Sequence, residues 1–152
     1  MVITAAELAE VVGIALETVN NWLRRGIIRR ATVGGRQLRS RLFSTDDVYK
    51  ATLTNERVQL GIAPSPASDA VNELWKSWEQ VKLQDRGNVY AVMYPNKSVI
   101  MCWQRRSGGP LLRRLKSPKG ESVEFQLPRQ AFAVILISDV VGDVTTRLLQ
   151  SI

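Results

Sequence analysis

Glycines divide the first 43 residues of this chain into short segments. Gly13 and Gly26 leave residues 14–25 between them, and residues 27–33 precede Gly34-Gly35. A glycine after a helical segment is typical of a helix end, and a glycine pair between two segments is typical of a tight hairpin turn. The spacing therefore predicts short helices and a hairpin that are separated by glycines.

Two short amphipathic helices are predicted, one on either side of Gly13. Thr4-Ala5-Ala6-Glu7 has the pattern of a capping box, in which the threonine hydroxyl and the glutamate carboxylate satisfy backbone amides reciprocally. The second helix is predicted over residues 15–25, and Gly26 stands where a left-handed residue ends a helix. Apolar residues line one face of each helix: Leu8, Val11 and Val12, then Leu16, Val19, Trp22 and Leu23.

A basic hairpin is predicted next, followed by a third helix. Residues 27–33 and 36–43 flank Gly34-Gly35, and two central glycines supply the positive φ that a tight hairpin turn needs. Ser44 then opens a capping sequence for the third helix. Residues 24–41 contain no acid and seven arginines: Arg24, Arg25, Arg29, Arg30, Arg36, Arg39 and Arg41.

The rest of the chain is predicted to hold a linker and a second, mixed domain. Pro64 and Pro66 mark residues 54–68 as a linker. A helix follows from residue 69 to about 82, with Val71, Leu74, Trp75 and Trp78 on one face. Strands are predicted over 88–94, 98–105, 110–116 and 121–127, and a closing helix over 139–149. Residues 131–137 fit either a buried strand or the start of that helix.

The predicted fold class is therefore α+β, in three parts. Residues 1–53 form the first domain, 54–68 the linker, and 69–152 a helix with a small antiparallel α+β domain. No run of eighteen apolar residues occurs and the N-terminus lacks a basic signal region, so we expect a cytoplasmic protein with no membrane contact.

Composition argues against catalysis and for a polyanionic partner. The chain has no His and a single Cys102, which removes the commonest general base and metal ligand; we expect no enzyme, no metal and no cofactor. The net charge is +7 and the pI about 10.1. A second basic block lies in residues 83–120, which contain eight basic residues and a single acidic residue, Asp85. It fits either a solvated hairpin or a further contact to an acidic partner.

The order of helix, turn, helix, basic hairpin and capped helix is typical of winged helix-turn-helix modules. A helix fits the DNA major groove, and a hairpin wing places arginines on the backbone or in the minor groove. The sequence therefore predicts double-stranded DNA as the partner. The predicted contact residues lie on the helix over 15–25 and on the wing over 28–43: Glu17, Thr18, Asn20, Asn21, Arg24, Arg25, Arg36, Arg39 and Arg41.

The residues also resemble the MerR/excisionase-type winged helix superfamily over about 50 positions. The resemblance rests on residues 3–9, Gly13, Thr18-Val19-Asn20-Asn21-Trp22, Gly26 and residues 41–48. It implies that Arg41 touches phosphate and that Asp47-Val48 begins the helix after the wing. Ala15, Phe43 and the Asn20-Asn21 pair depart from the MerR pattern, and the last of these favours the excisionase or terminase small-subunit branch.

Three functions follow as hypotheses. The first is a transcriptional regulator whose second domain oligomerises or senses a ligand, and the second is a mobile-element protein such as an excisionase, terminase small subunit or partition factor. The third is an enzyme in the C-terminal half, which the missing histidine disfavours. Because one winged module buries little DNA surface, we also expect a homodimer or higher oligomer held by residues 69–152.

Overall fold

The computed structural model describes residues 2–30, 32–33, 36–37, 42–81, 88–93, 99–109, 112–114, 122–124, 126 and 133–150. Within these ranges the chain has five helices and antiparallel strands, which confirms the α+β class. It divides into two compact units. Unit 1 comprises Met1–Val71 and Val140–Ile152, and unit 2 comprises Asn72–Asp139. None of the described helices is both long and apolar enough to cross a bilayer.

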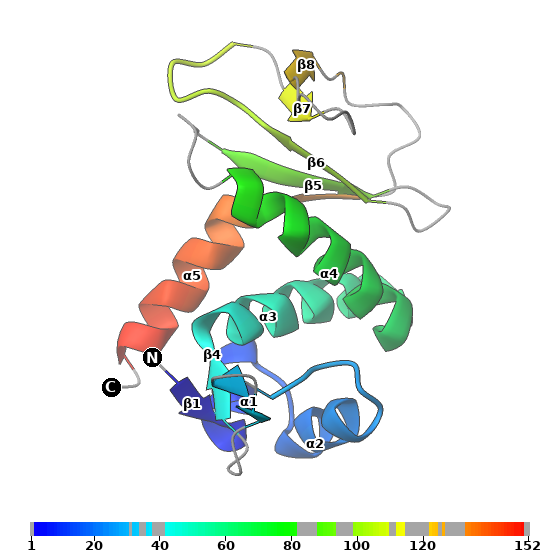
Figure 1. Ribbon diagram of the computed structural model, residues 1–152, viewed down its shortest axis with the longest axis vertical. Coiled ribbons are helices and arrows are strands. Elements are labelled where there is room, and N and C mark those ends of the chain that lie inside the picture. The colour runs from blue at the N-terminus through cyan, green and yellow to red at the C-terminus, as the bar shows by residue number, and fades with distance from the viewer. Residues whose placement is uncertain are drawn as a thin grey trace. The chain divides into compact units, whose positions relative to one another are not determined.

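Unit 1 begins with a short strand and the two predicted helices: β1 (Val2–Thr4), α1 (Ala5–Val12) and α2 (Leu16–Arg24) (Figure 1). The capping box is confirmed, since the Thr4 amide donates to Glu7 Oε2 at 2.6 Å and the Glu7 amide to Thr4 Oγ1 at 3.3 Å. The bond from the Thr4 amide also lowers the pKa of the Glu7 carboxyl. At the other end of α1, Gly13 adopts φ 76°, and its amide donates back to the Ala9 carbonyl at 2.9 Å.

α2 ends at the left-handed glycine that the sequence predicts. Gly26 has φ 68°, its amide donates to the Leu23 carbonyl at 3.1 Å, and the Ile27 amide donates to the Trp22 carbonyl at 2.9 Å. These two bonds form a Schellman-type end, which satisfies carbonyls that the last helical turn leaves without partners.

The first strand of the hairpin begins later than predicted, and β1 at the N-terminus was not predicted. β2 (Thr32–Val33) and β3 (Arg36–Gln37) are antiparallel with Val33 opposite Arg36, while Gly34-Gly35 and residues 38–41 lie outside the described residues. Residues 27–30 are not in a strand. The Ile27 amide donates to the Trp22 carbonyl at the end of α2, and the Ile27 carbonyl accepts a hydrogen bond from Ser68 Oγ at 2.5 Å. β4 (Leu42–Ser44) pairs instead with β1, with Phe43 opposite Ile3.

The predicted linker is largely helical. α3 runs over Thr45–Gln59 and α4 over Pro64–Val81, so only residues 60–63 separate them. Pro64 is the first residue of α4, a position where a residue without an amide proton loses no hydrogen bond. The prolines that predicted a linker therefore mark the start of a helix. The capping box that opens α3 is confirmed: the Ser44 amide donates to Asp47 Oδ2 at 2.9 Å, and the Asp47 amide to Ser44 Oγ at 3.2 Å.

The core of unit 1 includes residues from both ends of the chain. Leu8 of α1, Val19 of α2, Phe43 of β4 and Val48 of α3 are each 0% exposed and belong to one hydrophobic cluster. α5 (Ile137–Gln150) adds Val144 and Leu148 to the same cluster. The sequence grouped this helix with a domain over 69–152, whereas the structure packs its greater part into unit 1.

Unit 2 contains an antiparallel sheet whose strands match the predicted segments. The strands are β5 (Val89–Met93), β6 (Val99–Trp103), β7 (Leu112–Arg114), β8 (Ser122–Glu124) and β9 (Ala133–Leu136). Their order is β8-β7-β6-β5-β9, with Val89 opposite Trp103 and Tyr90 opposite Leu136. The ambiguous run over 131–137 thus contains a strand, and α5 begins at the residue after it.

Candidate nucleic-acid interface

α2 has one buried side and one polar side. Val19 is 0% and Trp22 3% exposed, which fixes the helix against the core of unit 1. Glu17, Asn21 and Arg24 are exposed, and their spacing of four and three residues places them along one line of the helix. The polar side also holds two half-buried residues, Thr18 and Asn20, and the exposed Arg25 at the C-cap.

The N-terminus of α2 carries no side-chain cap. Ala15 occupies the N-cap position in an extended conformation, with φ −65° and ψ 143°, and no side chain accepts from the first amides. Amides at a helix N-terminus together with the helix dipole attract phosphate groups. This end of α2 therefore retains donors beside the exposed line of Glu17 and Asn21.

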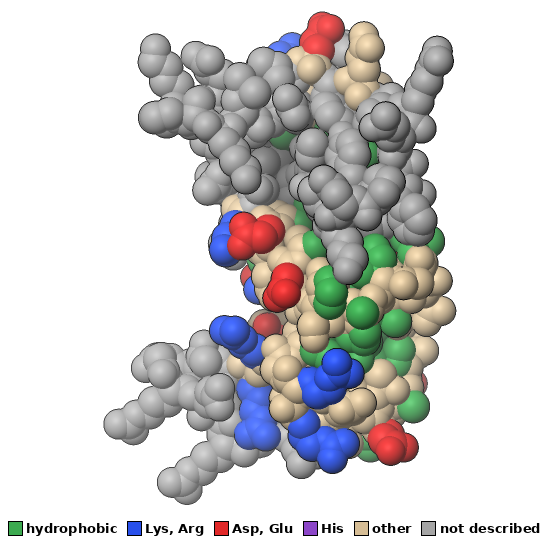
Figure 2. Space-filling model, turned by 90° about the vertical axis from the view of Figure 1, so that its right-hand side faces the viewer, with side chains coloured by type: hydrophobic (Ala, Val, Ile, Leu, Met, Phe, Trp, Pro, Cys, Tyr) green, Lys and Arg blue, Asp and Glu red, His purple; other side chains and the backbone are tan. Residues whose placement is uncertain are grey.

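A depression adjoins the other end of α2. It has a volume of about 720 Å³ and is lined, among the described residues, by Asn20, Leu23, Arg24, Gly26, Ile28, Arg29 and Arg30. Every charged residue in that set is an arginine. Figure 2 shows the side of the molecule that is at the right in Figure 1, and Lys and Arg side chains lie on the lower part of this face, the part of the molecule that includes α2. We call this feature the arginine-lined depression.

The segment that carries Arg29 and Arg30 is held in place on its buried side. Ile27 and Ile28 are 6% and 7% exposed and belong to the core cluster. Ser68 of α4 is itself buried, and its hydroxyl donates to the Ile27 carbonyl. The backbone next to the arginines is thus fixed at its apolar residues and by one buried hydrogen bond, while Arg29 is exposed.

The structure describes the positions of some predicted contact residues and not of others. It brings Asn20 and Arg24 together on the wall of the arginine-lined depression and leaves Glu17, Thr18, Asn21 and Arg25 on the polar side of α2. In the predicted wing, the backbone of Arg36 lies in β3, but its side chain, Arg39 and Arg41 lie outside the described residues. Five residues that line the depression were not among the predicted site residues: Leu23, Gly26, Ile28, Arg29 and Arg30, of which the acid-free arginine run indicated the last two.

The described residues offer neither of two kinds of reactive group, a metal-binding cluster or an accessible thiol. No group of three or more Asp, Glu or Cys side chains there is placed to hold a metal ion. Cys102 on β6 is 0% exposed, and burial raises the pKa of its thiol to about 11. A thiol in that state is a poor nucleophile, because the thiolate is the reactive form.

We expect Cys102 in the folded protein to react with a thiol reagent at pH 8 roughly a hundredfold more slowly than in the unfolded chain. A pKa two units above its ordinary value lowers the thiolate fraction by that factor, and burial adds to the effect. The measurement is the rate of labelling by a chromogenic disulfide, with and without guanidinium chloride. Rapid labelling of the native chain would contradict the burial.

The same shift predicts a pH dependence of stability. The folded state favours the neutral thiol, so its stabilising contribution is complete below pH 9 and is lost as the pH rises toward about 11. The wild type should therefore lose stability over that range relative to Cys102→Ala.

Among known proteins, no family model and no curated sequence matches this chain.

Proposed function

We propose that the chain is a sequence-specific double-stranded DNA-binding protein built on a winged helix-turn-helix. In this proposal α1 and α2 are the paired helices, α2 enters the major groove, and β2, β3 and the intervening residues form the wing. The proposed biological role is transcriptional regulation.

One observation supports the proposal: the polar side of α2 and the arginine-lined depression share two residues, Asn20 and Arg24. Asparagine amides pair with adenine, and arginine pairs with guanine or with phosphate. Asn20 and Arg24 belong both to α2 and to the depression, and Arg29 and Arg30 extend the positive charge beyond the helix. Base-reading and phosphate-binding groups are therefore contiguous, as DNA recognition requires.

The test of this proposal is selection of bound sites from a pool of random duplexes by the full-length chain. Enrichment of a defined sequence supports sequence-specific binding, and a palindromic site supports a symmetric dimer. Recovery of unbiased sequences at every salt concentration would contradict specific recognition.

Substitutions on α2 should change preference at individual base pairs. Asn21→Ala and Arg24→Ala are each expected to reduce discrimination at one position of the selected site by about 1–3 kcal/mol. Arg24→Ala should also lower the slope of log affinity against log salt by about one unit if the guanidinium binds phosphate instead. The control is Lys76→Ala, which removes one exposed cation from α4. If both α2 variants keep the wild-type preference, α2 does not read the groove.

Homodimerisation through residues 69–152 remains part of the proposal. Within that range Trp75 is 3% exposed in the single chain, and the side chain of Trp78 lies outside the described residues. Light scattering on the full-length chain, alone and with the selected duplex, distinguishes a preformed dimer from assembly on DNA.

A further inference from the structure

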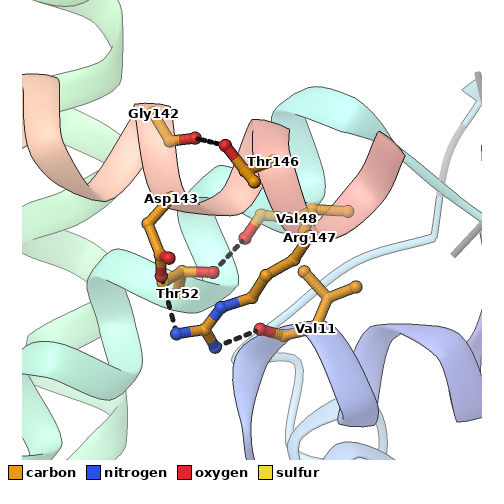
Figure 3. A network of polar contacts seen from close by, with 7 residues as sticks. All are labelled: Val11, Val48, Thr52, Gly142, Asp143, Thr146 and Arg147. Atoms are coloured by element: carbon orange, nitrogen blue, oxygen red, sulfur yellow. Dashed lines mark hydrogen bonds and ion pairs between the residues drawn. The ribbon is translucent and has the colours of Figure 1, made fainter. Parts of the chain in front are cut away.

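The carbonyl of Val11 lies at the turn between α1 and α2. A helix leaves its last carbonyls without intrahelical donors, and α1 ends at Val12. The amides that follow turn back to earlier residues: those of Gly13 and Ile14 both donate to the Ala9 carbonyl, at 2.9 and 3.0 Å. The donor to the Val11 carbonyl comes from the far end of the chain, because Arg147 Nη1 of α5 donates to it at 3.0 Å (Figure 3).

The guanidinium of Arg147 is held in this orientation by a neighbour on α5. Arg147 Nη2 lies 2.6 Å from Asp143 Oδ2, one turn earlier on the same helix. Figure 3 shows the guanidinium between the carboxylate of Asp143 and the carbonyl of Val11. The two side chains are 48% and 57% exposed, so the ion pair itself contributes little to stability. Its effect is to orient the nitrogen that reaches Val11. A cation at this end of α1 also complements the helix dipole.

α5 is fixed in place independently of Arg147. Val144 and Leu148 are 0% and 1% exposed and belong to the cluster that contains Leu8 and Val19. On the side of α3, the hydroxyl groups of Tyr49 and Thr145 lie 2.8 Å apart. Arg147 therefore contacts the end of α1 from a helix that is anchored by its own apolar residues.

We propose that Arg147 is a positioning residue for α2, and this inference rests on the proposed DNA-binding function. By binding the Val11 carbonyl it fixes the turn that begins at Gly13, and this turn sets the direction in which α2 leaves α1. The exposed line of Glu17, Asn21 and Arg24 depends on that direction. α5 follows β9 of unit 2 directly in the sequence, and its Arg147 contacts the turn before α2 within unit 1.

The first experiment is hydrogen–deuterium exchange on the full-length chain without DNA. Arg147→Met should increase exchange at the amides of Gly13 and Ile14, which donate to the Ala9 carbonyl, by about three- to tenfold, as expected for one lost hydrogen bond, with little change in β5 and β6. Arg147→Lys keeps a donor and should restore part of the protection. Lys76→Met is the matched control, since it breaks an exposed ion pair within one helix. Unchanged exchange at Gly13 and Ile14, or an equal increase throughout unit 1, would overturn the positioning role.

The second experiment measures affinity for the selected duplex and for a scrambled duplex. Arg147→Met should reduce the ratio of the two affinities by about three- to tenfold, and Arg147→Lys by less. A merely structural role would lower both affinities together and leave their ratio unchanged, which would overturn the inference. If exchange rises locally but the wild type shows no preference between the duplexes, the proposed function fails while the contact of Arg147 with the turn stands.

Discussion

Leu148→Ala is expected to lower the free energy of unfolding of unit 1 by about 2–5 kcal/mol, the usual range for removing a buried leucine. Leu148 is 1% exposed and shares its cluster with residues of α1, α2 and α3. The cavity would therefore open inside the unit proposed to bind DNA, although the mutation lies near the other end of the chain. Urea unfolding followed by circular dichroism measures the loss.

Leu149→Ala is the matched control for this substitution. It removes the same atoms from the next residue of α5, but Leu149 is 67% exposed, so the expected change is within about 0.5 kcal/mol. Similar small losses in both variants would show that α5 is not part of the core of unit 1. The predicted arrangement, with residues 69–152 as one domain and residues 1–53 folding alone, would then be favoured.

Local signals in the sequence predicted much of unit 1 correctly. The two capping boxes, at Thr4 and Ser44, and the left-handed Gly26 depend on residues within a few positions of one another, and all three occur as expected. The polar side of α2 was also predictable, because Val19 and Trp22 fix which side is buried. In each of these cases the interacting residues belong to a single turn or helix, so the sequence of that segment is sufficient for the prediction.

Contacts between distant residues were not predictable in this way. β1 has three residues, too few to show a period of two, and its pairing with β4 depends on the fold. The membership of Val144 and Leu148 in the core cluster of unit 1 likewise has no signature in local periodicity, because any amphipathic helix has such residues. The hydrogen bond from Arg147 to Val11 spans 136 positions and has no sequence signature.

Arg57 is the residue for which expectation and structure differ most in physical terms. An arginine in a helix is ordinarily solvent-exposed, yet Arg57 of α3 is 3% exposed. Among the described residues, its Nε and Nη2 atoms are buried without a hydrogen-bond partner. Burial lowers the pKa of the guanidinium, but the group remains charged at neutral pH. Two buried donors without acceptors oppose folding, because the energy of their lost hydration is not recovered.

Arg57→Met is therefore expected to raise the free energy of unfolding by about 1–3 kcal/mol, the cost of leaving a buried donor without an acceptor. Methionine keeps the unbranched shape and the high helix propensity of arginine while removing the charge. Arg57→Lys retains a buried cation and should give no increase, which separates the effect of charge from that of packing.

The measurement is urea unfolding of all three proteins in chloride and in inorganic phosphate at equal ionic strength. A gain in stability for Arg57→Met in both salts means that the guanidinium is unpaired in solution as it is in the structure. A loss of stability in both would instead show that Arg57 makes a favourable buried interaction, and the premise of an unpaired charge would be wrong. If phosphate stabilises the wild type and Arg57→Lys but not Arg57→Met, the buried cation takes an anion when one is supplied, since only the variant without the charge loses the response.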